Sequence, residues 1–344
     1  MLERPNITDE AIAAGMLGLY GLAVNDVTFL PIGYDVQSSA FKLQAQDGKS
    51  YFLKLRSGNF IPITVKVPEL LSSLGINGII PILKTRSGAS WGKLESHITI
   101  LYPFIPGHSG YQAGLSDQQW ELLGQLFRSI HTVMMPADLA KHIPHETYSP
   151  QWRQAARRFL DLAAHQGFTD PIASSLADFL AGKREVIVTM ITQADELAST
   201  LQHRPMKFVL CHADAHPGNY HLTDSGQLYL VDWDNAQFAP REHDLMCIGA
   251  GMMGDQPGGR QELLFYRGYG DVEIDHSALA YYRYERIIQD IAEFCKQILL
   301  SSEGGCDRQQ SLEYLISSFS PSREVEVAFH TDKMVIPKEK PTGV

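Results

Sequence analysis

Residues Phe208–Asp234, FVLCHADAHPGNYHLTDSGQLYLVDWD, hold most of the polar side chains on which our interpretation of this chain depends. The apolar run Phe208–Cys211 predicts a strand that leads into the polar loop His212–Asn219. Leu228–Val231 predicts a second strand, and Thr223–Gly226 before it has the composition of a hairpin turn. Two short strands would therefore bring the far end of the stretch back to the loop.

Three oxygen-bearing side chains of this stretch fit the needs of phosphoryl transfer: Asp214, Asn219 and Asp232. Transfer from a nucleotide requires a carboxylate that orients the acceptor hydroxyl and accepts its proton, and oxygen ligands that hold magnesium against the phosphates. A single Asp or Asn in a loop is more often a turn or capping residue. The prediction therefore depends on the spacing of all three residues.

The pattern His212-x-Asp214-x4-Asn219, followed by Asp232 at a strand end, resembles the catalytic loop and metal-binding segment of the aminoglycoside phosphotransferase family, relatives of the protein kinases. The resemblance implies that Asp214 is the catalytic base and that Asn219 is a magnesium ligand. Asp232 matches the aspartate of the kinase D-F-G segment, here D-W-D. His212 matches a loop histidine with a structural role.

A metal-dependent hydrolase is an alternative, because the same stretch holds five potential zinc ligands. They are Cys211, His212, Asp214, His216 and His221. This alternative gives no role to Asn219 or Asp232, and no second cluster of histidines and carboxylates completes a site. We therefore favour phosphoryl transfer.

Composition places the chain among globular proteins. With 344 residues, 44% of them hydrophobic, it can bury a large core, and two domains are favoured over one. Charged residues near the start argue against a secretory signal, and no apolar run approaches the roughly 18 residues of a membrane span. The four cysteines lack C-x-x-C spacing, which favours free thiols in a reducing cytoplasm. We expect a cytoplasmic protein without a membrane partner.

Acidic residues outnumber basic residues by 39 to 29, which gives a formal net charge of −10. This sign disfavours nucleic acid as a partner and attracts a cationic small molecule. Basic patches with interleaved aromatic residues are also missing from the sequence, so we expect no nucleic-acid binding. The sequence leaves open whether the protein is a monomer or a dimer.

The first part of the chain predicts a sheet preceded by a helix. Thr8 precedes an apolar pattern and Gly21 follows it, so we expect a short helix capped by Thr8. Five apolar runs predict an antiparallel sheet. These runs are Val27–Leu30, Ala40–Leu43, Tyr51–Leu55, Ile79–Leu83 and His97–Leu101.

The resemblance implies that this sheet binds the nucleotide. Lys54 lies on the third predicted strand, where the family carries the lysine that contacts the α- and β-phosphates. Glu69 is the first acidic residue after Lys54, so we expect it to pair with Lys54 from a helix that begins near Pro68. The connection that ends with Ser38 and Ser39 would fold over the phosphates.

Two prolines and a glycine in residues 102–107, YPFIPG, end the strand pattern and predict a linker between two lobes. In the family, adenine hydrogen-bonds to the backbone of this linker. The resemblance therefore places the base near Tyr102, Phe104 and Ile105.

Helical periodicity follows the linker, and Ser116 with Gln119 predicts a capping box. We expect an α+β, bilobal, protein-kinase-like fold. Residues 1–101 would form the nucleotide-binding lobe with its five-stranded antiparallel sheet and a helix. Residues 108–330 would form a mainly helical lobe with the catalytic loop and the acceptor pocket, and residues 331–344 a disordered tail.

Four strings look most like the spectinomycin phosphotransferases within the family. They are residues 102–105 (YPFI), 210–219 (LCHADAHPGN), 231–234 (VDWD) and 282–287 (YRYERI). This resemblance implies magnesium-dependent transfer of phosphate from ATP, or alternatively GTP, to a hydroxyl of an aminocyclitol or aminoglycoside antibiotic. Spectinomycin is the first candidate, and the sequence leaves open which hydroxyl is phosphorylated and whether resistance is the physiological role.

An acceptor that carries amino groups would need carboxylates around Asp214. We expect Asp234 and Glu285 to supply them, with Asp290 as a further candidate. Asp234 follows a predicted metal ligand by two residues and shares its side if the strand continues. The resemblance also implies that Asp244 braces the backbone of the catalytic loop, which is a structural role.

Two other functions remain open at this stage, because a fold does not determine a substrate. Related sequences phosphorylate choline, homoserine, methylthioribose or fructosamines, so the protein could be a metabolic kinase. A pseudokinase that binds nucleotide and acts as a scaffold is the non-enzymatic alternative. Release of ADP with a panel of acceptors would separate these alternatives.

Overall fold

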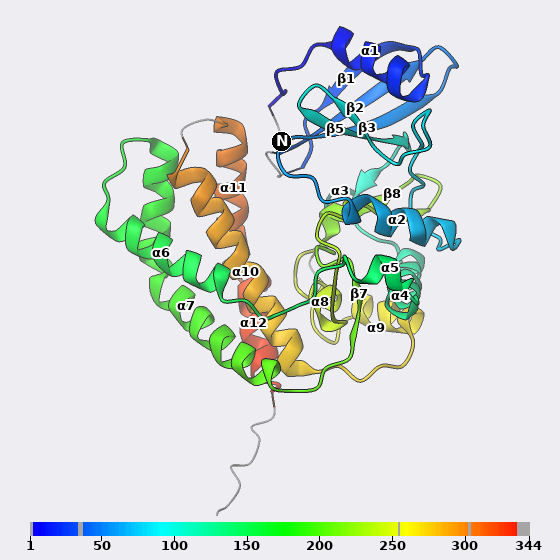
Figure 1. The fold of residues 1–344 in the computed structure, drawn as a ribbon. Helices are drawn as coiled ribbons and strands as arrows, with labels where there is room; N and C mark the ends of the chain where they lie inside the picture. The colour runs from blue at the N-terminus through cyan, green and yellow to red at the C-terminus, as the bar shows by residue number, and fades with distance from the viewer. Residues whose placement is uncertain (1–2, 34–36, 254, 302–303, 336–344) are drawn as a thin grey trace, which may run out of the picture.

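The structure is a computed structural model that describes residues 3–33, 37–253, 255–301 and 304–335. It has the predicted two lobes, one built on a sheet and a larger one that is mainly helical (Figure 1). Within the described ranges, no helix combines the length and the apolar character that a membrane span needs.

The N-terminal lobe contains a five-stranded sheet in the order β1-β2-β3-β5-β4, with antiparallel pairing throughout, as predicted. Its elements are α1 (Asp9–Tyr20), β1 (Val24–Leu30), β2 (Ser38–Ala45), β3 (Ser50–Arg56), α2 (Ile63–Ser73), β4 (Gly92–Leu94) and β5 (His97–Pro103). The Thr8 hydroxyl caps α1 by accepting a hydrogen bond from the N–H of Ala11 (3.2 Å). Gly21 ends α1 with φ 68°.

Alternation along β3 sends its side chains to two different environments. Leu53 and Leu55 are buried in the core under α1, where they pack with Met16. Because successive side chains of a strand point to opposite faces, Lys54 and Arg56 lie on the other face of the sheet. That face is the one that meets the second lobe.

One predicted strand was wrong. Ile79–Leu83 forms no strand, and only Leu83 makes an isolated bridge, to Leu101. Pro81 lies inside this run and has no N–H to donate to a ladder. The fifth strand of the sheet is β4, which pairs with β5 at the sheet edge.

The start predicted for α2 was also wrong. The helix begins at Ile63, so Pro68 lies inside it. Its buried stripe of Ile63, Val67 and Leu71 packs with apolar residues of the second lobe. Burial of these three side chains outweighs the hydrogen bond that Pro68 cannot donate.

The second lobe opens with β6 (His108–Ser109), α3 (Gly110–Ala113), α4 (Asp117–Thr132), α5 (Ala137–Ala140), α6 (Gln151–His165) and α7 (Pro171–Gln202). It continues with β7 (Phe208–Cys211), η1 (Pro217–Asn219), β8 (Tyr220–Leu222), β9 (Leu228–Leu230), β10 (Gln237–Pro240) and α8 (Glu242–Leu245). It ends with α9 (Arg260–Tyr269), α10 (His276–Leu299), α11 (Gly305–Ser318) and α12 (Glu324–Asp332). The capping box of Ser116 and Gln119 opens α4 as predicted. Residues 331 and 332 of the expected tail lie in α12, which is a correction, and residues 336–344 lie outside the described residues.

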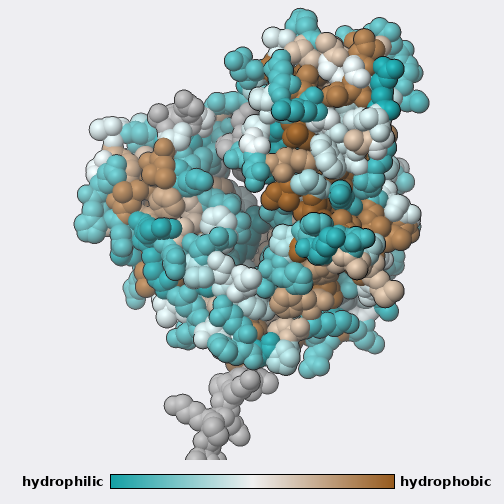
Figure 2. Space-filling view, viewed as in Figure 1, coloured by the Kyte–Doolittle hydropathy of each residue, from teal (hydrophilic) through white to brown (hydrophobic). Residues whose placement is uncertain are grey.

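Two groups of elements make up this lobe. Helix α10 packs against α6, α7, α11 and α12 around one apolar core. Helix α4 packs against α9 and β7 around another. Figure 1 shows the first group set apart from the N-terminal lobe, and Figure 2 shows the surface hollowed between them.

Short strands hold the loop between β7 and β8. The strands predicted on either side of the loop do not pair with each other. Instead β7 pairs with β10, and β9 pairs with β8 through the predicted hairpin turn. Two separate ladders therefore fix the two ends of the loop that carries Asp214.

Candidate active site

Two residues of the site have left-handed backbone conformations. Ala213 has φ 64° and Asp232 has φ 66°, a region that residues with a side chain rarely adopt. Such strain costs about 1–3 kcal/mol per residue and persists only where the surroundings impose it. The contacts around these two residues are therefore part of the site.

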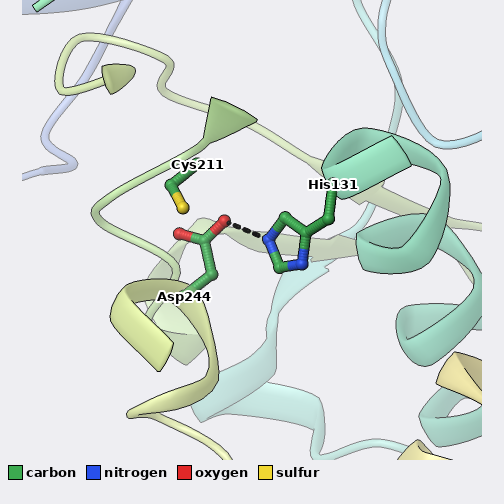
Figure 3. A group of neighbouring side chains, drawn as sticks. All are labelled: His131, Cys211 and Asp244. Carbon is green, nitrogen blue, oxygen red and sulfur yellow. Dashed lines mark hydrogen bonds and ion pairs between the residues drawn. The ribbon is translucent and has the colours of Figure 1, made fainter. Parts of the chain in front are cut away.

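Asp244 braces the loop at Ala213. Its carboxylate accepts hydrogen bonds from the backbone N–H groups of His212 (2.9 Å) and Ala213 (2.7 Å). His131 of α4 lies 3.0 Å from the same carboxylate through Nε2 (Figure 3). Its Nδ1 lies 2.8 Å from the Tyr269 hydroxyl. Burial works to raise the pKa of Asp244, but the hydrogen bond and charge of His131 lower it.

The group His131, Cys211 and Asp244 has the composition of a metal site, and its ligand atoms lie within 4.8 Å of one another. Each member already has a partner, however. The Cys211 thiol faces the carbonyl oxygens of Ala239 (3.7 Å) and Pro240 (3.6 Å). Burial raises the pKa of this thiol well above its ordinary value, and a protonated thiol is a poor ligand. We interpret the group as a structural brace.

The five zinc ligands of the hydrolase alternative do not gather. Nε2 of His212 lies 2.9 Å from the carbonyl of Val231, and Nε2 of His221 lies 2.9 Å from that of Ile105. The thiol of Cys211 faces the adjacent strand. Among the described residues these five form no ligand group, so the geometry does not support a zinc site.

The Asp214 carboxylate contacts one arginine and two side-chain amides. Arg286 of α10 forms an ion pair with its Oδ1. Its Oδ2 lies 3.4 Å from the side-chain nitrogens of Asn219 and Asn235. Burial works to raise the pKa of Asp214, but Arg286 and then His216 lower it below the ordinary value. An ionised, fixed carboxylate can orient an acceptor hydroxyl.

The structure brings Asn219 and Asp232 to the same region as Asp214. The amide nitrogen of Asn219 donates a hydrogen bond of 2.8 Å to the backbone carbonyl of Asp214. The backbone carbonyl of Asn219 accepts a bond of 3.0 Å from the N–H of Val231, the residue before Asp232. The loop and the end of β9 are thus tied together.

Lys54 crosses from the N-terminal lobe to two carboxylates. Its Nζ lies 2.8 Å from Asp232 and 2.9 Å from Asp234, and Arg56 also pairs with Asp234. Burial works to raise the pKa of Asp232, but the Lys54 ammonium lowers it to about 2. Burial and the charge of Asp232 raise the pKa of Asp234. Burial works to lower the pKa of Lys54, but the two carboxylates raise it.

The predicted pairing of Lys54 with Glu69 was wrong. Glu69 forms an ion pair with Lys84 and accepts a hydrogen bond of 2.6 Å from the Ser90 hydroxyl. The earlier start of α2 and the packing of its apolar stripe on the second lobe direct Glu69 toward the segment before β4. The carboxylates beside Lys54 come from the second lobe instead.

Ser38 and Ser39 lie at the start of β2, opposite Arg56 and Leu55 of β3. The loop before them was predicted to cover the phosphates, but its residues 34–36 lie outside the described residues. The two serines therefore lie on the strand next to Lys54, and their role stays a prediction.

The predicted linker is partly strand. Tyr102 is paired with Phe52 within β5. The Phe104 N–H donates to the Ser50 carbonyl at 3.1 Å. The carbonyl of Ile105 faces His221 of the second lobe at 2.9 Å. The segment therefore connects the two lobes at the edge of the site.

The two carboxylates that we expected at the acceptor, Asp234 and Glu285, are held in ion pairs in this structure, and their role toward an acceptor stays a prediction. Asp234 does lie on the side of Asp232, but it faces the cations of β3. Glu285 is buried and accepts from Arg153 at 2.5 Å. The candidate Asp290 pairs with Arg286.

Sequence reasoning missed Arg56, Asn235 and Arg286. A signal existed for Arg56, because it follows Lys54 by two residues and must share its face of the strand. Arg286 lay inside a string used for the resemblance, yet nothing in the sequence indicates Asp214 as its partner. Asn235 follows the D-W-D segment directly and lacks a comparable signal.

Comparisons with known proteins agree with this geometry. A profile described as the phosphotransferase enzyme family matches residues 27–282, which include Lys54, Asp214, Asn219 and Asp232. An uncharacterized protein of Synechocystis sp. (strain PCC 6803) is 30% identical over 146 residues, or 42% of this chain and 36% of that protein. The chain therefore spans little more than a third of that relative's length.

Two solved structures are similar over nearly the whole chain. The crystal structure of spectinomycin phosphotransferase APH(9)-Ia in complex with ADP and spectinomycin has a TM-score of 0.88 at 30% identity, covering 96% of this chain and 100% of that chain. The AMP-bound complex of the same enzyme has a TM-score of 0.83 at 31% identity, covering 94% and 98%. Because the family profile spans both lobes and the candidate site, this chain belongs to the phosphotransferase enzyme family and has its kinase-like fold.

Proposed function

We propose that this protein transfers the terminal phosphate of ATP to a hydroxyl group of spectinomycin or a closely related aminocyclitol. The observation that carries the proposal is the match, across both lobes, to an enzyme crystallised with ADP and spectinomycin. The net charge of −10 supports a cationic acceptor.

Asp214 is the proposed base. Its carboxylate is partly buried, ionised and contacted at both oxygens by Arg286 and two amides. It would orient the acceptor hydroxyl in line with the terminal phosphorus and take its proton as the new P–O bond forms. Most of the acceleration would come from this positioning and from charge stabilisation.

The residues present fit a magnesium ion. The amide nitrogen of Asn219 is engaged by Asp214, which directs its amide oxygen the other way. Asp232 adds a carboxylate whose pKa is about 2, so it is ionised at neutral pH. Hard oxygen ligands of this kind suit magnesium, which would neutralise charge on the phosphates when bound. Asn219 and Asp232 would hold it.

Lys54 and Arg56 would bind the phosphates from the opposite side. Both project from β3 toward Asp232 and Asp234. The Lys54 ammonium is shielded from water and keeps its proton, so it can neutralise phosphate oxygens. We propose that adenine lies along Tyr102, Phe104 and Ile105, whose backbone lies where the lobes join.

An ADP-release assay with a panel of acceptors tests this function. We expect release with spectinomycin and ATP, and no release with choline or homoserine. Release with choline or homoserine alone would identify a metabolic kinase, and no release with any acceptor would favour a scaffold. Parallel reactions with GTP measure the donor preference.

Asp214→Asn tests the proposed base. We expect turnover to fall by ~10²–10⁴, the range for loss of a general base, with the Kd of nucleotide little changed. Asp224→Asn is the matched control, because Asp224 lies exposed in the turn between β8 and β9. An Asp214→Asn protein with full turnover would contradict the mechanism.

A further inference from the structure

Arg286 joins two carboxylates inside the candidate active site. It forms an ion pair with Asp214, and its Nε lies 3.2 Å from Oδ1 of Asp290 and 3.3 Å from its Oδ2. The exposed fractions of the three side chains are 17%, 19% and 13% for Arg286, Asp214 and Asp290. Water therefore competes little with these ion pairs.

The three charges connect two parts of the second lobe. Asp214 belongs to the loop after β7, whereas Arg286 and Asp290 lie one turn apart on α10. Helix α10 is the centre of the group formed with α6, α7, α11 and α12 (Figure 1). Arg286 thus ties the catalytic loop to the rigid core of that group.

Other contacts of the Asp214 carboxylate are weaker. The amide nitrogens of Asn219 and Asn235 are each 3.4 Å from Oδ2, and Nε2 of His216 is 3.8 Å from Oδ1. The two amide contacts are long for hydrogen bonds, and the histidine contact is beyond hydrogen-bond distance. An arginine, by contrast, donates charge-assisted bonds from a rigid planar group. The orientation of the carboxylate therefore depends mainly on Arg286.

We propose that Arg286 is a positioning residue that fixes the carboxylate of Asp214 for the acceptor hydroxyl, and that Asp290 acts on the reaction only through Arg286. The role assigned to the hydroxyl rests on the proposed function above. Asp290 holds the guanidinium at Nε, whereas Asp214 pairs with Nη1. Without the cation, the carboxylate turns toward the amides of Asn219 and Asn235 and leaves the line of attack.

Steady-state kinetics of four variants test the proposal. They are Arg286→Met, Arg286→Lys, Asp290→Asn and the double variant Arg286→Met/Asp290→Asn. We expect Arg286→Met to lower kcat ~10²-fold, the cost of a misplaced reacting group, with the KM of ATP unchanged. Arg286→Lys restores part of kcat because it keeps the charge. Arg267→Met is the matched control, since that arginine is 70% exposed and paired at the surface.

The double variant separates the two roles of Asp290. If Asp290 acts only through Arg286, Asp290→Asn lowers kcat on its own but adds nothing to Arg286→Met. Additive losses, or a rise in the KM of the acceptor confined to Asp290→Asn, would show that Asp290 binds the acceptor itself and would overturn the proposal. Full kcat in Arg286→Met would also overturn it.

Crystal structures supply a readout that does not depend on turnover. We expect the Asp214 carboxylate in Arg286→Met to rotate away from its position in the unsubstituted protein, with the backbone of residues 212–219 unchanged. An unmoved carboxylate would refute the positioning role, whichever acceptor the enzyme uses. If the unsubstituted protein releases no ADP with any acceptor, the proposed function fails. The comparison of the two crystal structures still decides whether Arg286 positions the Asp214 carboxylate. Arg286→Lys and Asp290→Asn serve if Arg286→Met does not fold.

Discussion

At the residue scale, Asp244 shows how one buried side chain can hold a strained loop. Its carboxylate is fully buried and accepts from the backbone N–H groups of His212 and Ala213, while His131 faces it from α4. A buried donor without an acceptor costs about 1–3 kcal/mol. Asp244 therefore satisfies groups that would otherwise oppose the left-handed conformation of Ala213.

Replacement of Asp244 by alanine should destabilise the whole protein. The two N–H groups and the imidazole lose their partner together, so we expect the free energy of unfolding to fall by about 3–5 kcal/mol. Urea unfolding at neutral pH measures this loss. Turnover should fall as well, because the loop before Asp214 loses its brace.

Asp138→Ala is the matched control for this prediction. Its side chain is 99% exposed and pairs with Lys141 at the surface. We expect a change within about 0.5 kcal/mol. Equal losses for the two variants would mean that the brace contributes nothing to stability.

At the scale of elements, the crossing of α4 and α9 depends on two glycines. A Cβ atom on Gly124 would clash with the Phe265 carbonyl and lie 2.6 Å from the Tyr269 nitrogen. A Cβ atom on Gly268 would clash with the Glu121 carbonyl. The two helices therefore touch through their backbones. This close approach brings the Tyr269 hydroxyl to the imidazole that supports the catalytic loop.

Gly124→Ala should destabilise the protein although alanine favours helices. The helices must move apart, so we expect the free energy of unfolding to fall by about 1–3 kcal/mol. Gly182→Ala on α7 is the control, because its Cβ would meet nothing within 4 Å. There alanine should raise the free energy of unfolding by roughly 0.5–1 kcal/mol. Urea unfolding of both variants checks the opposite signs.

At the scale of the whole molecule, Lys54 links the two lobes. Its strand belongs to the N-terminal sheet, and its partners Asp232 and Asp234 belong to the second lobe. We propose above that Lys54 binds the nucleotide phosphates, so the same cation would serve both the ligand and the contact between the lobes. On that proposal, ligand binding and lobe association would be coupled at this residue.

Lys54→Met should remove most of the stabilisation by nucleotide. A ligand at 100 times its Kd stabilises the folded state by about 2.7 kcal/mol, so Tm should rise when ATP and magnesium are added to the unsubstituted protein. We expect a much smaller rise for Lys54→Met in a thermal shift assay. Lys93→Met, at an exposed position of β4 in the same sheet, should keep the full rise. A full rise in Lys54→Met would contradict the assignment.

The stability of the molecule should also depend on pH through Glu285. Burial raises the pKa of this carboxyl to about 7, against the opposing effect of Arg153. Its Oε1 is buried and has no hydrogen-bond partner among the described residues. Because its folded-state pKa is raised, the protonated carboxyl of Glu285 contributes to the free energy of unfolding. This contribution is complete below the unfolded-state pKa of about 4.3 and is lost as pH rises through the folded-state pKa of about 7.

Glu285→Gln should remove this pH dependence. We expect the unsubstituted protein to lose about 1–3 kcal/mol between pH 5 and pH 8 relative to the variant, measured by urea unfolding at each pH. Asp195→Asn is the control, because Asp195 is the other carboxylate that pairs with Arg153 and its side chain is 39% exposed. The pH dependence of its unfolding should match that of the unsubstituted protein. A constant difference between Glu285→Gln and the unsubstituted protein across this range would refute the prediction.

Local sequence patterns determined the elements and the core of the site. Some patterns depend on burial or hydrogen bonds within a few residues, so the sequence alone predicts the structure they form. Examples are the alternation in β3, the caps at Thr8 and Ser116, and the spacing of Asp214 and Asn219. They predicted a five-stranded antiparallel sheet, the helical lobe and the loop that carries Asp214, whose role as a base was implied by the family resemblance and stays a proposal. Two predictions were wrong, the strand at Ile79–Leu83 and the late start of α2. Both errors arose where the effect of a proline had to be weighed against burial of apolar side chains.

Only the tertiary structure decided which charged groups meet. Lys54 contacts Asp232 and Asp234 rather than Glu69, and Asp214 contacts Arg286, a residue far away in sequence. Periodicity tells which face of an element is buried, but an ion pair depends on how whole elements dock and which rotamers remain. The packing of α2 on the second lobe and of α10 in its helical group made those choices, and no local pattern records them.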